Sequence, residues 1–112
     1  MNKTEHLLVC ASEECAELQQ AISKALRFGL DDGSPDRQTT NAEDIMKEYT
    51  DLISVMMMLL EAGAIKDFNM DRAIEAKREK VLKYMDYARK RGTLEEEYVY
   101  DDSDSFADWE KG

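Results

Sequence analysis

A nearly continuous apolar segment, Leu52–Leu60, is the feature of the sequence that most constrains its fold, because only Ser54 interrupts it. The segment is too short to span a bilayer. If it is helical, apolar side chains cover most of the helix, and one neighbouring helix cannot bury them all. A chain of 112 residues forms only a modest core of its own. We therefore predict an all-α fold in which three main helices per subunit complete a four-helix-type bundle by oligomerisation.

The boundaries of the first two helices are predicted from capping residues. The first helix is expected to have Thr4 as its N-cap and to stop near Gly29. Thr40 and Glu43 match the Ser/Thr-x-x-Glu capping box, so a second helix should begin there and end near Gly63. A loop rich in turn-forming residues is expected between the two helices.

A third helix is predicted from about Phe68 to Arg91, with Asn69 or Asp67 at its start and Gly92 as its terminator. Apolar residues at three- and four-residue steps define the expected buried faces of the first and third helices. These are Leu8, Ala11, Cys15, Leu18, Ile22, Ala25 and Leu26 in the first, and Ile74, Val81, Met85 and Ala88 in the third.

The charge of the chain is unevenly distributed and divides it into two regions. Eight acidic residues and only one basic residue, Lys111, follow Thr93, and the whole chain has a net charge of −10. We predict a helical domain over residues 1–92 and an acidic tail over 93–112 that is disordered or docks on a subunit surface. An acidic chain without a basic stripe is not expected to bind a nucleic-acid polymer. No signal-peptide pattern is visible, so a cytoplasmic location without membrane contact is expected.

The two cysteines, Cys10 and Cys15, lie five residues apart on one predicted helix. At about 100° per residue they point in different directions and cannot form a disulfide within that helix. Cys15 falls among apolar positions and is expected to be a small core residue. The absence of a CxxC motif or a Cys/His cluster from the sequence excludes a structural zinc site.

Two acidic pairs are the best candidates for chemistry. Glu14 and Glu17 lie on the first helix, Glu48 and Asp51 lie on the second, and each pair has three-residue spacing. Such spacing projects both carboxylates from one helix face about one turn apart. In a chain with 25 acidic residues this spacing alone is weak evidence. Position is stronger evidence, because Glu48 falls inside the apolar arc that continues through Leu52–Leu60, with Asp51 at its edge.

The four carboxylates have two interpretations. They bind a cation between two antiparallel helices, or they form a structural salt-bridge cluster with Lys24, Arg27 or Lys47. Carboxylates without a nearby histidine or thiolate select a hard cation, so Mg²⁺ is the expected cofactor, with Mn²⁺ as an alternative. The sole histidine, His6, lies outside both pairs. Mg²⁺ bound in this way prefers to share its ligand shell with phosphates, which indicates a phosphate ester or anhydride as substrate.

The residues Glu13, Glu14 and Glu17, followed by Glu48 and Asp51, resemble the EExxE and ExxD motifs of the MazG-like all-α nucleoside triphosphate pyrophosphohydrolases. This superfamily includes dimeric dUTPases and dCTP pyrophosphatases. The resemblance implies a Mg²⁺-dependent enzyme that converts a (d)NTP to the monophosphate and pyrophosphate in nucleotide-pool house-cleaning. It also implies a homodimer or homotetramer assembled through the second helix.

The resemblance assigns a role to each matching residue. The metal ligands would be Glu14, Glu17, Glu48 and Asp51. Glu13 would assist them or orient the attacking water, and Lys77 and Lys80 would contact phosphates. Lys24 and Arg27, at the end of the first helix beside the loop, are additional phosphate-binding candidates.

Two other functions fit the same sequence. In one, the chain is a non-enzymatic helical interaction module, whose acidic pairs bind basic residues of a partner and whose acidic tail docks. In the other, the metal scaffold hydrolyses a phosphoribosyl-ATP type substrate. Metal-dependent release of pyrophosphate separates the first alternative from an enzyme, and a panel of substrates separates the second.

Overall fold

The computed structural model describes residues 1–33, 35–36 and 38–95, and most of the predicted acidic tail lies outside these ranges. The described residues form three helices and no strand: α1 (Lys3–Phe28), α2 (Asn41–Glu61) and α3 (Met70–Arg91). The predicted all-α class is therefore confirmed. The chain divides into two compact units, one covering Met1–Asp67 and one beginning at Phe68.

Polar side chains cap the start of each helix. The Thr40 hydroxyl accepts a hydrogen bond from the Glu43 amide at 3.2 Å, and the Glu43 carboxylate accepts one from the Thr40 amide, so the predicted capping box is confirmed. Asn69 caps α3, one of the two predicted starts. The prediction of Thr4 for α1 is wrong. The side chain of Asn2 accepts a hydrogen bond from the Glu5 amide at 2.8 Å, so α1 begins earlier.

Glycine residues end α1 and α3, as predicted. Gly29 has φ +101° and Gly92 has φ +82°, backbone conformations that residues with a side chain rarely adopt. The Gly29 amide donates to the Ala25 carbonyl oxygen at 2.8 Å and closes the last turn of α1. The Gly92 amide donates to the Arg89 carbonyl oxygen at 3.0 Å and closes the last turn of α3.

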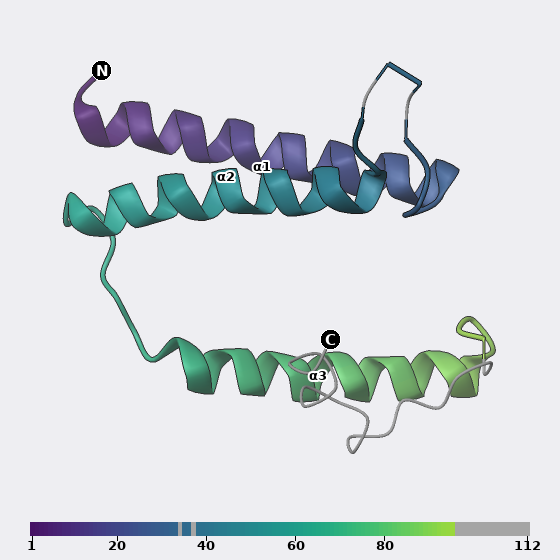
Figure 1. Ribbon diagram of the computed structural model, residues 1–112. Helices are drawn as coiled ribbons and strands as arrows, with labels where there is room; N and C mark the ends of the chain where they lie inside the picture. Colours follow the sequence, from purple (N-terminus) through teal and green to yellow (C-terminus); the bar gives the residue numbers. More distant parts are fainter. Residues whose placement is uncertain (34, 37, 96–112) are drawn as a thin grey trace, which may run out of the picture. The chain divides into compact units, whose positions relative to one another are not determined.

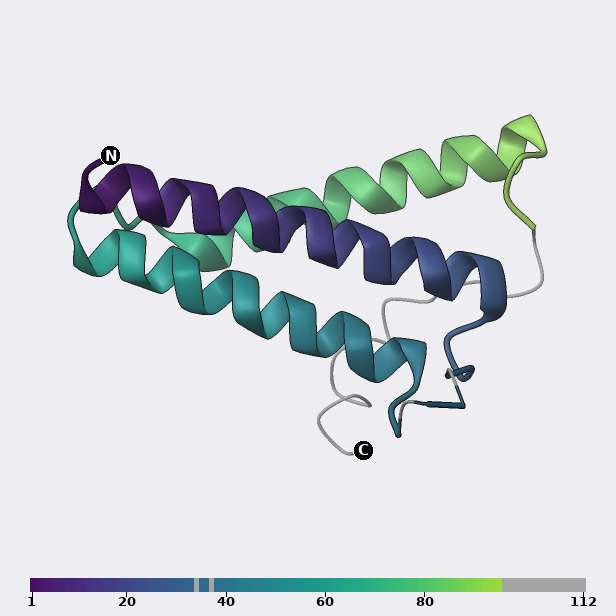
Figure 2. The ribbon, with the colours of Figure 1, turned by 90° about the horizontal axis from the view of Figure 1, so that it is seen from above.

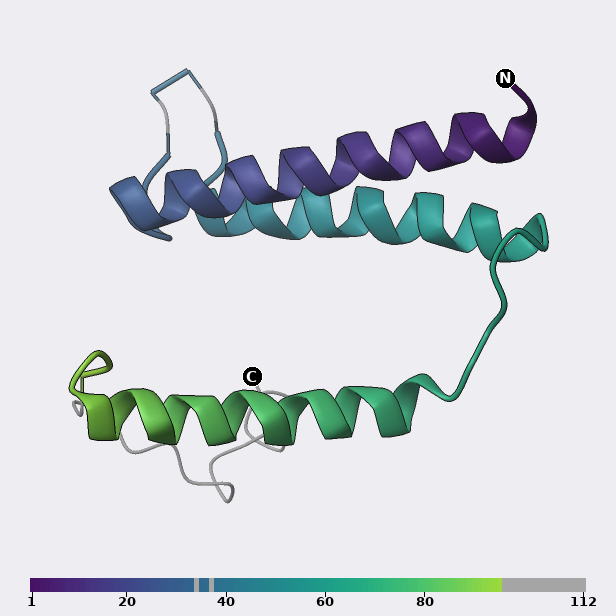
Figure 3. The same cartoon turned by 180° about the vertical axis from the view of Figure 1, so that it is seen from behind.

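The first unit is an antiparallel hairpin of α1 and α2, which lie side by side along most of their length (Figures 1 and 2). Its apolar core lies toward the end of the hairpin opposite the α1–α2 loop. The core is formed by Leu7, Ala11 and Leu59, with Val55 and Ile65 packed against it. Seen from behind, the same two helices remain in contact (Figure 3). Small side chains such as Ala11 allow the helix backbones to approach closely.

Each helix of the hairpin contributes one row of buried or half-buried residues to this contact. The rows advance by alternating steps of four and three residues, the spacing that keeps one side of a helix facing its partner. They consist of Leu7, Ala11, Glu14, Leu18, Ala21 and Ala25 on α1, and Asn41, Ile45, Glu48, Leu52, Val55 and Leu59 on α2. One glutamate in each row therefore occupies a position where an apolar residue would be expected.

The predicted buried face of α1 is wrong on one flank. Ala11 and Ala25 are buried as expected, whereas Leu8 and Leu26 are exposed, with 83% of Leu26 accessible. Cys15 is also exposed, so it is not a core residue. The reason is that α1 has apolar side chains on two flanks, and α2 covers the flank that contains Glu14.

Apolar residues of α2 and α3 also remain accessible. On α2, Met57 is 52% exposed and Met58 is 46% exposed, because α1 covers only one side of this helix. All of α3 is described and none of its residues is fully buried: of the predicted inner face, Ile74 is 50% exposed, while Met85 and Ala88 are half-buried. Among the described residues, no helix combines the length and apolar character needed to cross a membrane.

Candidate functional site

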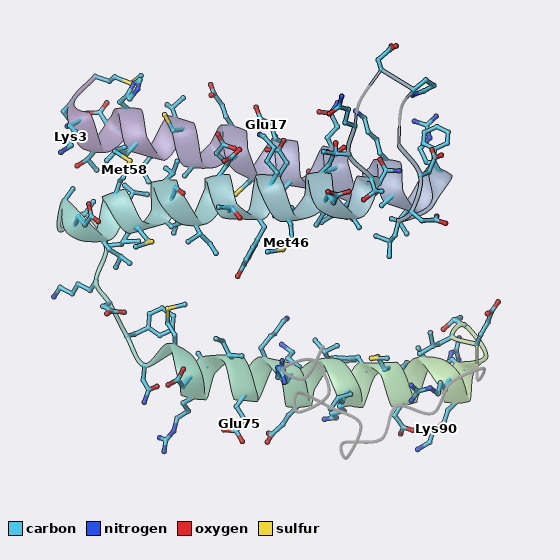
Figure 4. The ribbon with its side chains drawn as sticks, in the orientation of Figure 1. Lys3, Glu17, Met46, Met58, Glu75 and Lys90 are labelled. Atoms are coloured by element: carbon cyan, nitrogen blue, oxygen red, sulfur yellow. The ribbon has the colours of Figure 1, made fainter. Side chains whose placement is uncertain are left out.

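Three acidic side chains from the two helices of the hairpin meet at its middle. Glu14 and Glu17 of α1 and Glu48 of α2 each present a carboxylate oxygen, and these oxygens lie within 4.8 Å of one another. Glu17 is labelled in Figure 4. Glu14 and Glu48 are half-buried because they belong to the facing rows, while Glu17 is exposed. The structure thus brings together three of the four carboxylates expected to converge. We call these three residues the glutamate cluster.

Two oxygens of the glutamate cluster are buried without a partner. Glu14 Oε2 and Glu48 Oε2 are inaccessible to solvent, and neither accepts a hydrogen bond from any residue that the structure describes. A buried acceptor left unpaired costs about 1–3 kcal/mol, and more when it is charged. One of these oxygens comes from α1 and the other from α2, and the carboxylate of Glu17 lies beside them. The arrangement is therefore unfavourable for the chain alone and would be relieved by a cation.

The fourth predicted carboxylate, Asp51, lies outside the glutamate cluster. Its Oδ2 atom accepts from Lys47 Nζ at 2.9 Å, an ion pair between residues four apart on α2. Lys47 Nζ also lies 3.6 Å from Glu48 Oε1. The hydrogen bond and charge of Asp51, followed by the charge of Glu48, raise the pKa of Lys47 above its usual value. Lys24, Arg27 and Lys47 were the ion-pair partners expected from the sequence, and the structure shows salt bridges of Lys47 with Glu48 and Asp51.

A polar pocket of about 500 Å³ lies directly beside the glutamate cluster. It shares Glu17 and Glu48 with the cluster, and it also contains two lysines, Lys24 from α1 and Lys47 from α2. The other lining residues are Gln20, Ala21, Thr39, Asn41 and Asp44. Ligand pockets have volumes of this order. The lining carries three carboxylates, Glu17, Asp44 and Glu48, and two ammonium groups.

The α1–α2 loop supplies one lining residue of the pocket, Thr39, and its other residues bond to Asn41, the first residue of α2. Asn41, only 3% exposed, donates from its side chain to the Gly29 carbonyl at 2.9 Å, and its amide donates to the Asp32 carbonyl at 2.7 Å. Gly33 lies against the backbone of Thr39, and a Cβ atom there would collide with the Thr39 carbonyl oxygen. These contacts hold the loop against Asn41 and against Thr39, two residues before it.

The remaining predicted site residues of the first unit, Glu13 and Arg27, are not members of the cluster. Glu13 is exposed on α1, next to Glu14 in sequence but outside the group of three. Arg27 lies over the ring of Phe28, 5.0 Å from its centre, and does not line the pocket. Lys77 and Lys80 belong to the second unit. There they line a different pocket, of about 430 Å³, with Val81, Tyr84, Met85, Ala88, Thr93 and Leu94.

Sequence reasoning missed the pocket residues supplied by the loop and the start of α2. Thr39 and Asn41 flank the capping residue Thr40 and read as ordinary helix-start residues. The position of Asn41 could have indicated its role. It is a polar residue at the start of the buried row of α2, and a buried polar side chain needs a hydrogen-bond partner. Lys47 was considered only as a structural ion-pair partner, and its place in the pocket lining was not expected.

The fold and the site together define an all-α protein with a carboxylate-lined pocket between two antiparallel helices. Comparison with known protein families, with curated proteins and with solved structures finds no match for this chain.

Proposed function

We propose that the glutamate cluster binds Mg²⁺, with Mn²⁺ as an alternative, and that the protein hydrolyses a (d)NTP to its monophosphate and pyrophosphate. The observation that carries the proposal is the pair of buried, partnerless oxygens on Glu14 and Glu48, contributed by facing helices. Carboxylate oxygens are hard ligands that Mg²⁺ prefers. The resemblance of the acidic motifs to the MazG-like superfamily supports the same assignment.

The donor set fits a divalent cation. Glu14, Glu17 and Glu48 would supply oxygens from two helices, and Asp51, one helical turn from Glu48, would be the fourth ligand after leaving Lys47. A Mg²⁺ ion held there would supply charge neutralisation for phosphate oxygens and lower the pKa of a bound water. Glu13, exposed beside Glu14, would assist in orienting the attacking water.

The pocket beside the cluster suits the phosphate chain of the nucleotide. Lys24 and Lys47 place positive charge in its lining, next to Glu17 and Glu48. Phosphoanhydride cleavage depends mainly on alignment and charge neutralisation, so no serine or cysteine nucleophile is needed. Water adds to the α- or the β-phosphorus atom and gives up a proton to solvent, the anhydride bond between these two atoms breaks, and pyrophosphate leaves with its charge balanced by basic side chains. Lys77, Lys80 and Arg27 are additional candidates for phosphate contact.

We also propose that the protein assembles as a homodimer or homotetramer through α2. Four apolar side chains in the carboxyl-terminal half of this helix are at least 38% exposed, and burying them in a second subunit would complete a bundle. They are Ile53, Met56, Met57 and Met58. Light scattering at micromolar concentration should give a mass of at least two chains, and a well-folded monomer would refute the assembly.

A substrate screen tests the proposed activity. The chain is incubated with canonical and damaged (d)NTPs and with phosphoribosyl-ATP, with Mg²⁺ or with chelator, and pyrophosphate release is measured. We expect release from at least one nucleotide that stops with chelator and with Glu48→Gln. Glu61→Gln removes the same charge from the exposed end of α2 and should retain activity. Release from no substrate would overturn the proposal and favour the interaction module.

A further inference from the structure

Asp51 is separated from the glutamate cluster by an ion pair, and this separation has a functional consequence. We infer that Lys47 is an internal counter-ion that withholds Asp51 from the metal site until a divalent cation binds, when Asp51 exchanges its bond with Lys47 for the cation. The inference rests on the proposed function and concerns regulation of the same site. It gives Lys47 the role of a positioning residue.

The positions of the three side chains on α2 allow this exchange. Glu48 is 19% exposed and faces α1, Asp51 is 40% exposed at the edge of the contact, and Lys47 is 67% exposed on the solvent side. Residues three apart on a helix have Cβ atoms about 5–6 Å from each other. The Asp51 carboxylate is therefore one helical turn from the glutamate cluster on one side and bonded to Lys47 on the other.

The lysine does not satisfy the cluster itself. Its ammonium group contacts Oε1 of Glu48, while Oε2 of Glu48 and Oε2 of Glu14 remain buried and unpaired. One positive charge at the solvent side also compensates only part of the charge of three carboxylates. A divalent cation between the helices can reach the unpaired oxygens, and it then attracts Asp51 more strongly than a singly charged, solvated ammonium does.

The released lysine remains useful because it already lines the adjoining pocket. Once Asp51 turns toward the cation, the Lys47 ammonium loses its 2.9 Å partner and is available for a phosphate oxygen. Loading of the cation would thus prepare the pocket for an anionic substrate. The order of events would be cation first, phosphate second.

Titration with Mn²⁺ in the absence of nucleotide tests the inference on the full chain, with free Mn²⁺ measured by electron paramagnetic resonance. Lys47→Met should bind Mn²⁺ roughly three- to tenfold more tightly than the wild type, because it removes a competing and repelling charge. Asp51→Asn should bind more weakly. In the Asp51→Asn background, Lys47→Met should increase Mn²⁺ affinity by about twofold or less, because Lys47 no longer has an anionic residue 51 to withhold from the site.

Matched variants make the outcomes distinguishable. Lys3 lies at the start of α1, where Figure 4 labels it, about 16 Å along the helix axis from Glu14. Lys3→Met removes the same charge as Lys47→Met and should not alter Mn²⁺ affinity. Lys47→Gln should reproduce Lys47→Met. Failure of the wild type to bind Mn²⁺ would refute the proposed function and the inference with it. Two results would overturn the inference alone. In the first, the wild type binds Mn²⁺ and Glu48→Gln does not, but Lys47→Met binds no more tightly than the wild type. In the second, Lys47→Met increases Mn²⁺ affinity by the same factor in the wild-type and the Asp51→Asn backgrounds.

Discussion

Neutralising Glu48 should stabilise the chain in chelator while abolishing its response to Mg²⁺. One carboxylate oxygen from each residue of the glutamate cluster lies within 4.8 Å of the corresponding oxygens of the other two. At that separation, and with an effective dielectric constant of about 20, two unit charges repel by about 3.5 kcal/mol. Side-chain relaxation and the exposure of Glu17 reduce this figure. Glu48→Gln also forfeits the ion pair with Lys47, which contributes little at an exposed site.

The net expectation is a free energy of unfolding about 1–2 kcal/mol higher for Glu48→Gln than for the wild type in chelator. The glutamine amide can also donate to the unpaired Oε2 of Glu14, whereas the carboxylate cannot. Mg²⁺ at about a hundredfold excess over its Kd should raise the stability of the wild type by about 2.7 kcal/mol and leave the variant unchanged. The order of stabilities therefore reverses when Mg²⁺ is added.

Urea denaturation followed by far-UV circular dichroism measures this reversal directly. Glu61→Gln is the matched control, since it removes a carboxylate from the same helix about 20 Å away along its axis, at an exposed position. Its stability should change by no more than about 0.5 kcal/mol in either condition. A Glu48→Gln variant that is less stable than the wild type in chelator, or equally stabilised by Mg²⁺, would refute the reasoning.

Three further predictions concern the loop, the helix start and the lysine. Thr40→Ala should lower the free energy of unfolding by about 1 kcal/mol, because the capping box is lost, and urea titration measures it. Gly33→Ala should destabilise the loop, since the added Cβ meets the Thr39 carbonyl, and pyrophosphate release should fall with it; unchanged stability would contradict the contact. Asp51 raises the pKa of Lys47 above its usual value of 10.5, so the stabilisation by this ion pair is present at neutral pH and lost as the pH rises past that value. The difference in urea midpoint between the wild type and Lys47→Met should therefore disappear in strongly alkaline solution, and a difference that persists there would be evidence against the ion pair.

The helix boundaries were largely predictable because capping is a local property. Thr40 with Glu43, and the glycines Gly29 and Gly92, each act within one turn of the helix they begin or end. The exception was the start of α1, where two residues, Asn2 and Thr4, offered suitable side chains. The prediction named Thr4, and the structure uses Asn2, two residues earlier.

The flank of α1 that packs against α2 was not predictable from apolar spacing. Residues such as Leu8 and Leu26 form an apolar strip of their own, yet α2 covers the neighbouring strip that includes Glu14. The position of Glu48 within the contact was predictable, because its place on the helix follows from its spacing to Leu52. The position of Asp51 was not, since a single nearby lysine decides which way a short carboxylate turns.

The two glutamates in the facing rows also determine how the hairpin is aligned. Alanine and leucine side chains pack acceptably at several offsets, so apolar contact alone would permit α2 to slide along α1 by a heptad. Such a slip would carry Glu48 into the alanines and leucines of the opposite row and bury its charge among them. A polar residue at one core position selects a single register at some expense of stability. Glu14 and Glu48, halfway along the hairpin, therefore favour the observed register of α1 and α2 over the shifted ones.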